Sequence, residues 1–400
     1  MMRNEKKKIL VIGEHFSENL GDGVICQSVE FLINQFFPDS ELILSDLSGR
    51  LYFMNAYKGH EKFSVRSKYL ISKWTHRALS KNTFLYALYV HGRWNRAANI
   101  KEKSDQEYDL AIFAGGQMFM DYFSLPIHRH MKYLVKHNTP TIFNACGMGR
   151  VNSTLLQKRL QQALSHENIN SISARDHVNQ INEKLLNTDI QATQSHDCAL
   201  WTKEAFNIQK KESNVIGLGV ISLSNKKDKK VVKLYTDIIT ELNNKGDEWE
   251  LFGNGSFDDH ELALKIAHSL GYDESVIAKR PLNPTELVQT IANYRSIISF
   301  RLHSHIIAVS LDIPTIAITW DNKVDFFFEN IERPDRVFQY DSHFQDVLTK
   351  LFEAEQMGYD NDLIRTQKEE CLSNLVENLA LAFDSDLLEQ NETPISNIEV

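Results

Sequence analysis

Three basic side chains stand directly after a short apolar segment in the C-terminal third of the chain. The segment Ile297–Phe300 is rich in β-branched residues, as a buried parallel strand is, and Arg301, His303 and His305 follow it. In an open α/β sheet, ligands bind beyond the carboxyl ends of the strands, close to helix N-termini that attract anions. The residue types and their position therefore predict a site for an anionic substrate. The alternative is a solvated turn whose basic residues form ion pairs with nearby aspartates.

A polar loop follows the first predicted strand, Lys8–Glu14, and opens a helix. It carries Asn19, Gly21 and Asp22, and glycines at this point let backbone N–H groups approach a ligand closely. The spacing is neither that of a dinucleotide fingerprint nor that of a Walker A loop, which excludes both kinds of site. Asp22 is either a helix cap or a catalytic carboxylate.

The same arrangement recurs along the N-terminal half, where glycines and charged residues follow further predicted strands. These residues are Gly115 and Gly116 at the end of the strand at 109–116 with Gln117 and Asp121 just beyond it, Gly147 and Gly149 after the strand at 139–146, and Arg175 and Asp176 at the end of the strand at 172–176. This repetition places many candidate ligand-binding groups at one edge of a predicted sheet.

Strands that alternate with helical segments predict parallel βαβ units, and at 400 residues two domains are expected. We therefore expect an α/β protein with two doubly wound, Rossmann-type domains that face each other across a ligand cleft. The first is expected to span residues 1–206 and the second residues 214–383, joined by a polar linker. The acidic tail, residues 384–400, is expected to be disordered.

Composition narrows the class of function. The net charge of −9 argues against a general nucleic-acid binder, and no apolar run approaches the length of a membrane span. The N-terminus leads directly into a strand without a signal-peptide core, so we expect a cytoplasmic protein. The four cysteines are scattered without CxxC spacing, which indicates neither a zinc site nor a disulfide framework.

One segment departs from this acidic balance. Residues 58–96 contain nine Lys or Arg and a single acid, with seven aromatic residues between them. A basic, aromatic segment can lie on an anionic membrane surface, so peripheral contact with the inner face of the cell membrane is a hypothesis. A helical excursion with a solvated basic face is the alternative.

Taken in order, these segments resemble the polysaccharide pyruvyl transferase family, from about residue 9 to about residue 330. The matching segments are Asn19–Asp22, Ala114–Asp121, Gly147–Gly149, Ser173–Asp176, His196–Leu200, Arg301–His303, Ile313–Ile316 and Trp320–Lys323. Each match is weak alone, but the ordered set is specific. Gln117 stands where the family often has a third glycine, and Cys198 stands where it often has proline. Both departures could mark a sugar substrate that differs from those of other family members.

The resemblance implies a GT-B-like pair of Rossmann domains. It also implies transfer of pyruvate from phosphoenolpyruvate onto two hydroxyls of a sugar, as a cyclic ketal, with release of phosphate and with neither a cofactor nor a metal. The implied acceptor is a saccharide precursor of an exopolysaccharide or capsule, lipid-linked at the cytosolic face of the membrane.

This chemistry assigns roles to the candidate residues. Arginine binds carboxylates and phosphates bidentately, so Arg175 and Arg301 are expected to hold phosphoenolpyruvate from two sides, and the resemblance adds Leu302 and Lys323. His303 is the expected proton donor to the methylene carbon, because histidine titrates near neutral pH. It would share a side with Arg301 if the chain is still extended there.

The expected roles of the other candidate residues are less specific. The apolar run at 306–311 predicts the following helix, and His305 is expected inside that helix. Either Asp22 or Asp121 is expected to take the proton from the attacking hydroxyl, and the sequence does not rank them. The loop residues expected near the site are Asn19, Gly21, Gly115, Gly116 and Gln117.

Two other classes of function stay open at this point. One is a GT-B glycosyltransferase that uses a nucleotide sugar, which the order of the N-terminal motifs disfavours. The other is a non-catalytic module that binds glycans or anions, which the presence of both arginine and histidine at the predicted site disfavours.

Overall fold

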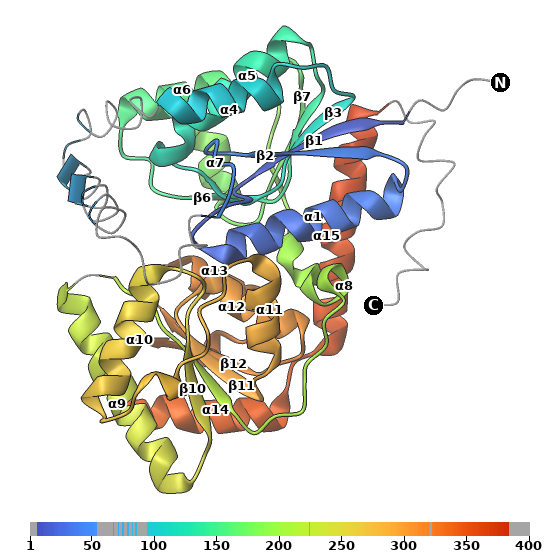
Figure 1. The fold of residues 1–400 in the computed structure, drawn as a ribbon. Helices are drawn as coiled ribbons and strands as arrows, with labels where there is room; N and C mark the ends of the chain where they lie inside the picture. Colours follow the sequence, from blue (N-terminus) through green and yellow to red (C-terminus); the bar gives the residue numbers. More distant parts are fainter. Residues whose placement is uncertain are drawn as a thin grey trace. The chain divides into compact units, whose positions relative to one another are not determined.

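The computed structural model describes residues 6–53, 94–223, 225–319 and 322–383, with positions 67, 71, 74, 75, 78, 79, 82 and 85. The tail 384–400 and most of the basic segment 58–96 lie outside the described residues. By compactness the chain divides into two units, each with its own sheet (Figure 1). The first unit comprises residues 1–17, 25–198 and 369–400, and the second comprises residues 18–24 and 199–368.

A parallel sheet forms the centre of the first unit. Its strands lie in the order β2-β1-β3-β5-β7-β8, and β4 and β6 form a separate parallel pair. The elements are β1 (Lys8–Gly13), α1 (Leu20–Phe36), β2 (Glu41–Asp46), α4 (Trp94–Ser104), β3 (Leu110–Phe113), β4 (Gly116–Phe119), η2 (Asp121–Phe123), α5 (Ser124–Lys136), β5 (Thr141–Phe143), β6 (Cys146–Met148), α6 (Thr154–Ala163), β7 (Ile169–Ala174), α7 (Val178–Lys184) and β8 (Thr193–Gln194). The first turn of α1 belongs by its contacts to the second unit.

A second parallel sheet, in the order β10-β9-β11-β12-β13, forms the centre of the second unit. The elements are η3 (Cys198–Trp201), α8 (Thr202–Phe206), β9 (Ile216–Gly219), α9 (Asn225–Lys245), β10 (Trp249–Phe252), α10 (Phe257–Ser269), η4 (Glu274–Val276), α11 (Pro284–Ala292), β11 (Ser296–Ser299), α12 (Leu302–Ser310), β12 (Thr315–Thr319), α13 (Asn322–Asn330), η5 (Pro334–Arg336), β13 (Val337–Gln339), α14 (Phe344–Met357) and α15 (Asn361–Ala382). Helix α15 continues from the second unit into the first at residue 369.

Each sheet is covered by helices, which explains the near-continuous apolar runs of its inner strands. In the first unit α4, α5 and α6 pack side by side (Figure 1). In the second unit α9 contacts α10 and α14, whereas α12 contacts α11 and α13. The central strands β1, β3, β9 and β11 are buried almost throughout. Both units are therefore doubly wound α/β domains, as predicted.

At residues 274–276 the chain forms the short helix η4, where the Asp273 carboxylate accepts from the Ser275 N–H, and Ile277 then makes an isolated parallel bridge with Leu251. Two local predictions were wrong. The strand predicted at 139–146 is broken into β5 and β6 at Ala145, whose φ is +48°. Helix α12 begins at Leu302 rather than near residue 306, because Arg301 is its extended N-cap residue.

The compact units also differ from the predicted domain boundaries. Residues 199–206 group with the second unit, where α8 contacts α11 and α12 and the Lys203 N–H donates to Ser310 Oγ (2.9 Å). Residues 369–383 group with the first unit, where Cys371 Sγ lies 3.5 Å from Cys198 Sγ.

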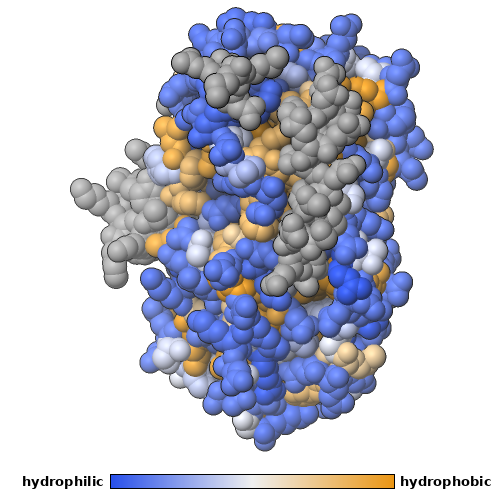
Figure 2. Space-filling view, turned by 90° about the vertical axis from the view of Figure 1, so that its right-hand side faces the viewer, coloured by the Kyte–Doolittle hydropathy of each residue, from blue (hydrophilic) through white to orange (hydrophobic). Residues whose placement is uncertain are grey.

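Hydrophilic residues cover most of the described surface in Figure 2, with smaller hydrophobic areas between them. None of the helices in the described part of the chain is both long and apolar enough to cross a membrane.

Candidate functional site

The strand order of the second sheet reverses at β9. The chain passes from β9 to β10 on one side and then to β11 on the other, and the carboxyl ends of strands at such a switch point are where open α/β sheets bind ligands. The register places Gly219, Phe252 and Ser299 in one row at this edge. Arg301 follows Ser299 by two residues, so the predicted anion site lies at the switch point of the second unit.

A buried carboxylate orients the Arg301 side chain. Its Nη2 and Nε donate to Asp259 Oδ2 at 2.5 and 3.2 Å, while the Arg301 N–H donates to Ser299 Oγ. Burial raises the pKa of Asp259, and the Arg301 charge and the Ser222 N–H oppose that effect. The Arg301 side chain keeps 22% of its surface exposed, and Nη1 has no hydrogen-bond partner among the described residues. Arg301 is thus held in place with donor capacity remaining for an anion.

His303 lies in the first turn of α12, so the extended chain on which its shared side with Arg301 depended is not present. Its ring packs against the first turn of α1. A Cβ atom added at Gly21 would lie 2.3 Å from His303 Cβ and 2.4 Å from Nδ1. His303 Nδ1 lies 3.7 Å from Asp22 Oδ1, and Asn19 Nδ2 donates to the same oxygen (3.3 Å). The structure therefore brings Asn19, Gly21, Asp22 and His303 together within one unit.

His305 lies inside helix α12, as predicted, and is fully buried. Its Nδ1 is 2.7 Å from Thr315 Oγ1, and its ring meets Phe328 edge to face. Burial lowers the pKa of His305 to about 3, so the ring is neutral at physiological pH. Its contacts are those of a core residue.

Arg175 follows β7 in the first unit and is buried between two carboxylates. Its Nη1 pairs with Asp197 Oδ2, and its Nε lies 3.5 Å from Asp176 Oδ2. Asp176 Oδ1 in turn accepts the Met148 N–H (2.8 Å), and Gly147 leaves room for the cluster. The ion pair with Asp176 is therefore present, and the role of Arg175 in binding phosphoenolpyruvate stays a prediction.

Asp121 is also tied into the first unit. Its Oδ2 accepts the N–H groups of Asn152 (3.0 Å) and Ser153 (3.2 Å), which holds the loop before α6. Burial raises the pKa of Asp121, and these two N–H groups oppose that effect. The nearby Gln117 donates to the Met148 carbonyl (3.3 Å).

The remaining predicted residues have simple positions. Gly115 and Gly116 turn the chain between β3 and β4 with φ values of +96° and +87°, a conformation that glycine adopts readily. Leu302 is the buried first residue of α12, and Lys323 lies half-buried in the first turn of α13. Within the described residues no cluster of His, Cys, Asp or Glu could hold a metal ion.

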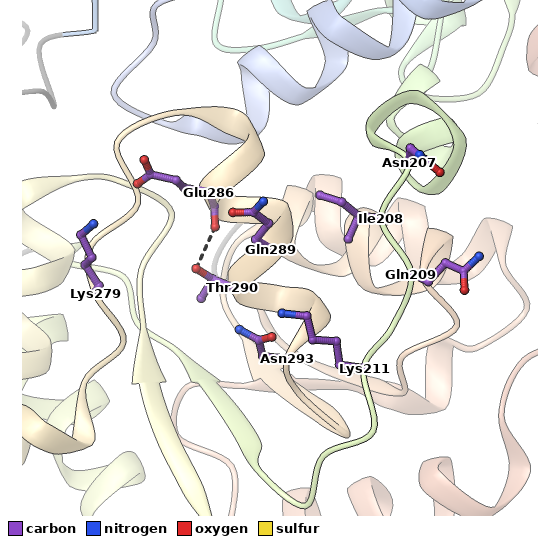
Figure 3. A pocket seen from close by; sticks show the side chains of 9 residues that line it. All are labelled: Asn207, Ile208, Gln209, Lys211, Lys279, Glu286, Gln289, Thr290 and Asn293. Carbon is purple, nitrogen blue, oxygen red and sulfur yellow. Dashed lines mark hydrogen bonds between the residues drawn. The ribbon is translucent and has the colours of Figure 1, made fainter.

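A pocket of about 600 Å³ lies elsewhere in the second unit, between α11 and the segment 207–211 (Figure 3). It is lined by Asn207, Ile208, Gln209, Lys211, Lys279, Glu286, Gln289, Thr290 and Asn293. None of the predicted site residues lines it. Ile208 is the single apolar residue type among the described residues of this lining, whereas hydrophobic and aromatic side chains predominate in a typical small-molecule site. Glu286 is engaged in capping α11.

Sequence reasoning missed three residues of the Arg301 site: Asn254, Asp259 and Ser304. Asp259 orients Arg301, and Asn254 accepts a hydrogen bond from the Ser304 hydroxyl. The available signal was the loop that begins at Gly253, because a polar loop after β10 must lie at the same sheet edge as the loop after β11.

The comparisons with known proteins agree with this fold. The UDP complex of MnaA from S. aureus is 12% identical over 95% of this chain and 97% of its own, with a TM-score of 0.52. A putative UDP-N-acetylglucosamine 2-epimerase from Listeria monocytogenes is 9% identical over 94% and 96%, with a TM-score of 0.52. The UDP-GlcNAc 2-epimerase from Methanocaldococcus jannaschii is 10% identical over 93% and 99%, with a TM-score of 0.51.

These likenesses show a fold of the GT-B type, built from two Rossmann-like domains. No curated protein matches the chain. The family model described as polysaccharide pyruvyl transferase matches residues 19–322, from the turn that holds Asp22 to the segment beyond His303, and the chain therefore belongs to that family of enzymes.

Proposed function

We propose that this protein transfers pyruvate from phosphoenolpyruvate onto two hydroxyls of a sugar, forming a cyclic ketal and releasing phosphate. The observation that carries the proposal is the arrangement at the switch point of the second sheet. There an oriented arginine with remaining donor capacity lies beside a histidine–carboxylate pair. The membership in the pyruvyl transferase family supports the reaction class.

The reaction makes two demands on the protein. Protonation of the methylene carbon converts it to a methyl group and leaves a cation-like centre at the carbon that bears the phosphate. One hydroxyl adds there and loses its proton, the bond to phosphate breaks, and the second hydroxyl adds in the same way. Of the two hydroxyl protons, one returns to the general acid and the other leaves with phosphate or solvent. A general acid and an anion site are therefore both required.

Arg301 meets the demand for an anion site. Asp259 fixes two of its nitrogens, so the planar guanidinium is presented with little loss of side-chain entropy on binding. The N-terminus of α12 adds backbone donors and a favourable dipole for an anion. We assign Leu302 and Lys323 to the same pocket and propose Arg175 as the second arginine for the donor substrate.

His303 is the proposed general acid. The Asp22 carboxylate lies 3.7 Å from Nδ1, which leaves Nε2 as the nitrogen proposed to give its proton to the methylene carbon. Asp22 is a better candidate than Asp121 for accepting a hydroxyl proton, because its carboxylate lies beside His303. The Asp121 oxygens are engaged by backbone N–H groups.

The proposed acceptor is a saccharide precursor of a surface polysaccharide, lipid-linked at the cytosolic face of the membrane. The basic composition of residues 58–96 supports contact with an anionic lipid surface. Flotation with liposomes that contain anionic lipid should carry the protein upward, and flotation with neutral liposomes should not.

Two measurements test phosphoenolpyruvate as the donor substrate and His303 as the general acid. Phosphoenolpyruvate should raise the unfolding temperature, whereas UDP, GDP or CMP sugars should not; the opposite result would favour a nucleotide-sugar transferase. Replacement His303→Ala should lower kcat for phosphate release by ~10²–10⁴-fold, the usual size of a general-acid contribution. The exposed His268 on α10 supplies the control His268→Ala. Full turnover by His303→Ala would contradict the assignment.

A further inference from the structure

Asn254 lies in the loop between β10 and α10 and is 1% exposed. It follows Phe252 by two residues, and Phe252 pairs with Gly219 of β9. Gly219 pairs on its other side with Ser299, which precedes Arg301 by two residues. Asn254 and Arg301 therefore occupy equivalent positions on either side of β9, at the edge of the sheet that carries the site.

Two hydrogen bonds connect Asn254 to the two helices that carry the proposed acid and its carboxylate. Its backbone carbonyl accepts the Leu20 N–H (3.0 Å), and its Oδ1 accepts the Ser304 hydroxyl (2.8 Å). Leu20 begins α1 two residues before Asp22, and Ser304 follows His303 directly in α12. One residue thus links the first turns of α1 and α12.

The Asn254 side chain is not accounted for by stability alone. Its Nδ2 is buried without an acceptor among the described residues, and a buried donor without a partner is unfavourable. An apolar side chain of similar size would fill the same space without that cost. Groups of this kind in native proteins call for an explanation, and here the remaining amide oxygen makes the link to Ser304.

We propose that Asn254 and Ser304 are positioning residues that set the separation between the His303 imidazole and the Asp22 carboxylate. The proposal rests on the proposed function, in which His303 gives a proton to the substrate. His303 Nδ1 lies 3.7 Å from Asp22 Oδ1 on α1. Among the other charged groups of the described residues at this edge, Arg301 pairs with Asp259 of α10, Asp228 of α9 accepts the Leu223 N–H, Asp325 of α13 accepts from Thr319, and Lys323 lies in the first turn of α13. The link acts on the distance between Asp22 and His303, because it joins the first turns of the helices that carry them.

The test compares two serines of the same helix. Ser304→Ala removes the link, whereas Ser310→Ala removes a buried hydroxyl at the other end of α12 that accepts the Lys203 N–H. Histidine-labelled protein is titrated by NMR, with the His303 signals assigned by their loss in His303→Gln. The titration midpoint of His303 should move by about 0.5 pH unit or more in Ser304→Ala and stay in place in Ser310→Ala.

Kinetics supply the second readout. In Ser304→Ala, kcat for phosphate release from phosphoenolpyruvate should fall ~10–10²-fold, as expected for a small misplacement of a catalytic group. KM should change by less than about twofold, because Arg301 is untouched. Ser304→Thr, which keeps the hydroxyl, should recover most of the rate. Asn254→Leu should behave as Ser304→Ala, and if it fails to fold, the serine variants decide.

The proposal is overturned if Ser304→Ala and Ser310→Ala leave the His303 midpoint equally unchanged. If wild-type protein releases no phosphate from phosphoenolpyruvate, the proposed function fails, while the NMR comparison still decides whether the link positions His303. The two failures are therefore distinguishable.

Discussion

Gly21 offers a direct test of how the candidate site is assembled. The first turn of α1 approaches the His303 side chain so closely that a Cβ atom at position 21 would lie 2.3 Å from His303 Cβ. Carbon atoms in contact are normally about 3.5–4.0 Å apart, so Gly21→Ala requires a movement of about 1 Å of the turn or of the histidine. Either movement changes the distance between Asp22 and His303.

The expected energy has two opposite contributions. In an open helix, alanine in place of glycine stabilises by up to ~1 kcal/mol. Added volume in a packed interior usually destabilises by about 1–3 kcal/mol, and the overlap here is severe. We therefore expect Gly21→Ala to lower the free energy of unfolding, although the same change would raise it in an unobstructed helix.

A double-mutant cycle isolates the contact. The free energy of unfolding is measured by urea denaturation for wild type, Gly21→Ala, His303→Gly and the double variant. Because His303→Gly removes the atoms that the new methyl group meets, the cost of Gly21→Ala should fall by at least about 1 kcal/mol in that background. An equal cost in both backgrounds would refute the packing of α1 on His303. In the wild-type background Gly21→Ala should also lower kcat by ~10²-fold.

Three further predictions concern charge and space. Burial raises the pKa of Glu30 to about 7 from 4.5, so the free energy of unfolding should fall as the pH rises through this window. Glu30→Gln should add roughly 3 kcal/mol to the free energy of unfolding at pH 8 and almost nothing at pH 4, as measured by urea denaturation at both pH values. Gly147→Ala places a Cβ 3.0 Å from Arg175 Nε and should destabilise by about 1–3 kcal/mol; unchanged stability would contradict the tight cluster. Arg301→Lys should weaken phosphoenolpyruvate binding at least ~10-fold in calorimetry, because the bidentate fork is lost. Arg295→Lys, at the other end of β11, is its control and should bind normally.

Much of the fold followed from local pattern. The strands β1 and β11 were predicted to within one residue of their observed bounds, because short runs of buried apolar residues between polar segments have few other solutions. The start of α12 was missed because its first turn carries His303 and Ser304, whose polarity hides the helical period. Their side chains are satisfied by groups far away in the sequence, which no local pattern reveals.

The pattern of strands and helices along the sequence was enough to predict a doubly wound α/β protein, and it also predicted a candidate site beyond the strand ends that includes Arg301 and His303. Parallel connectivity requires these placements, since every strand of such a sheet ends at the same edge. Only the tertiary structure decided that Asp22 lies beside His303 and that Asn254 links their helices. Those contacts join distant segments whose separation depends on how helices pack on a sheet, and side-chain packing of that kind leaves no periodic signal in the chain.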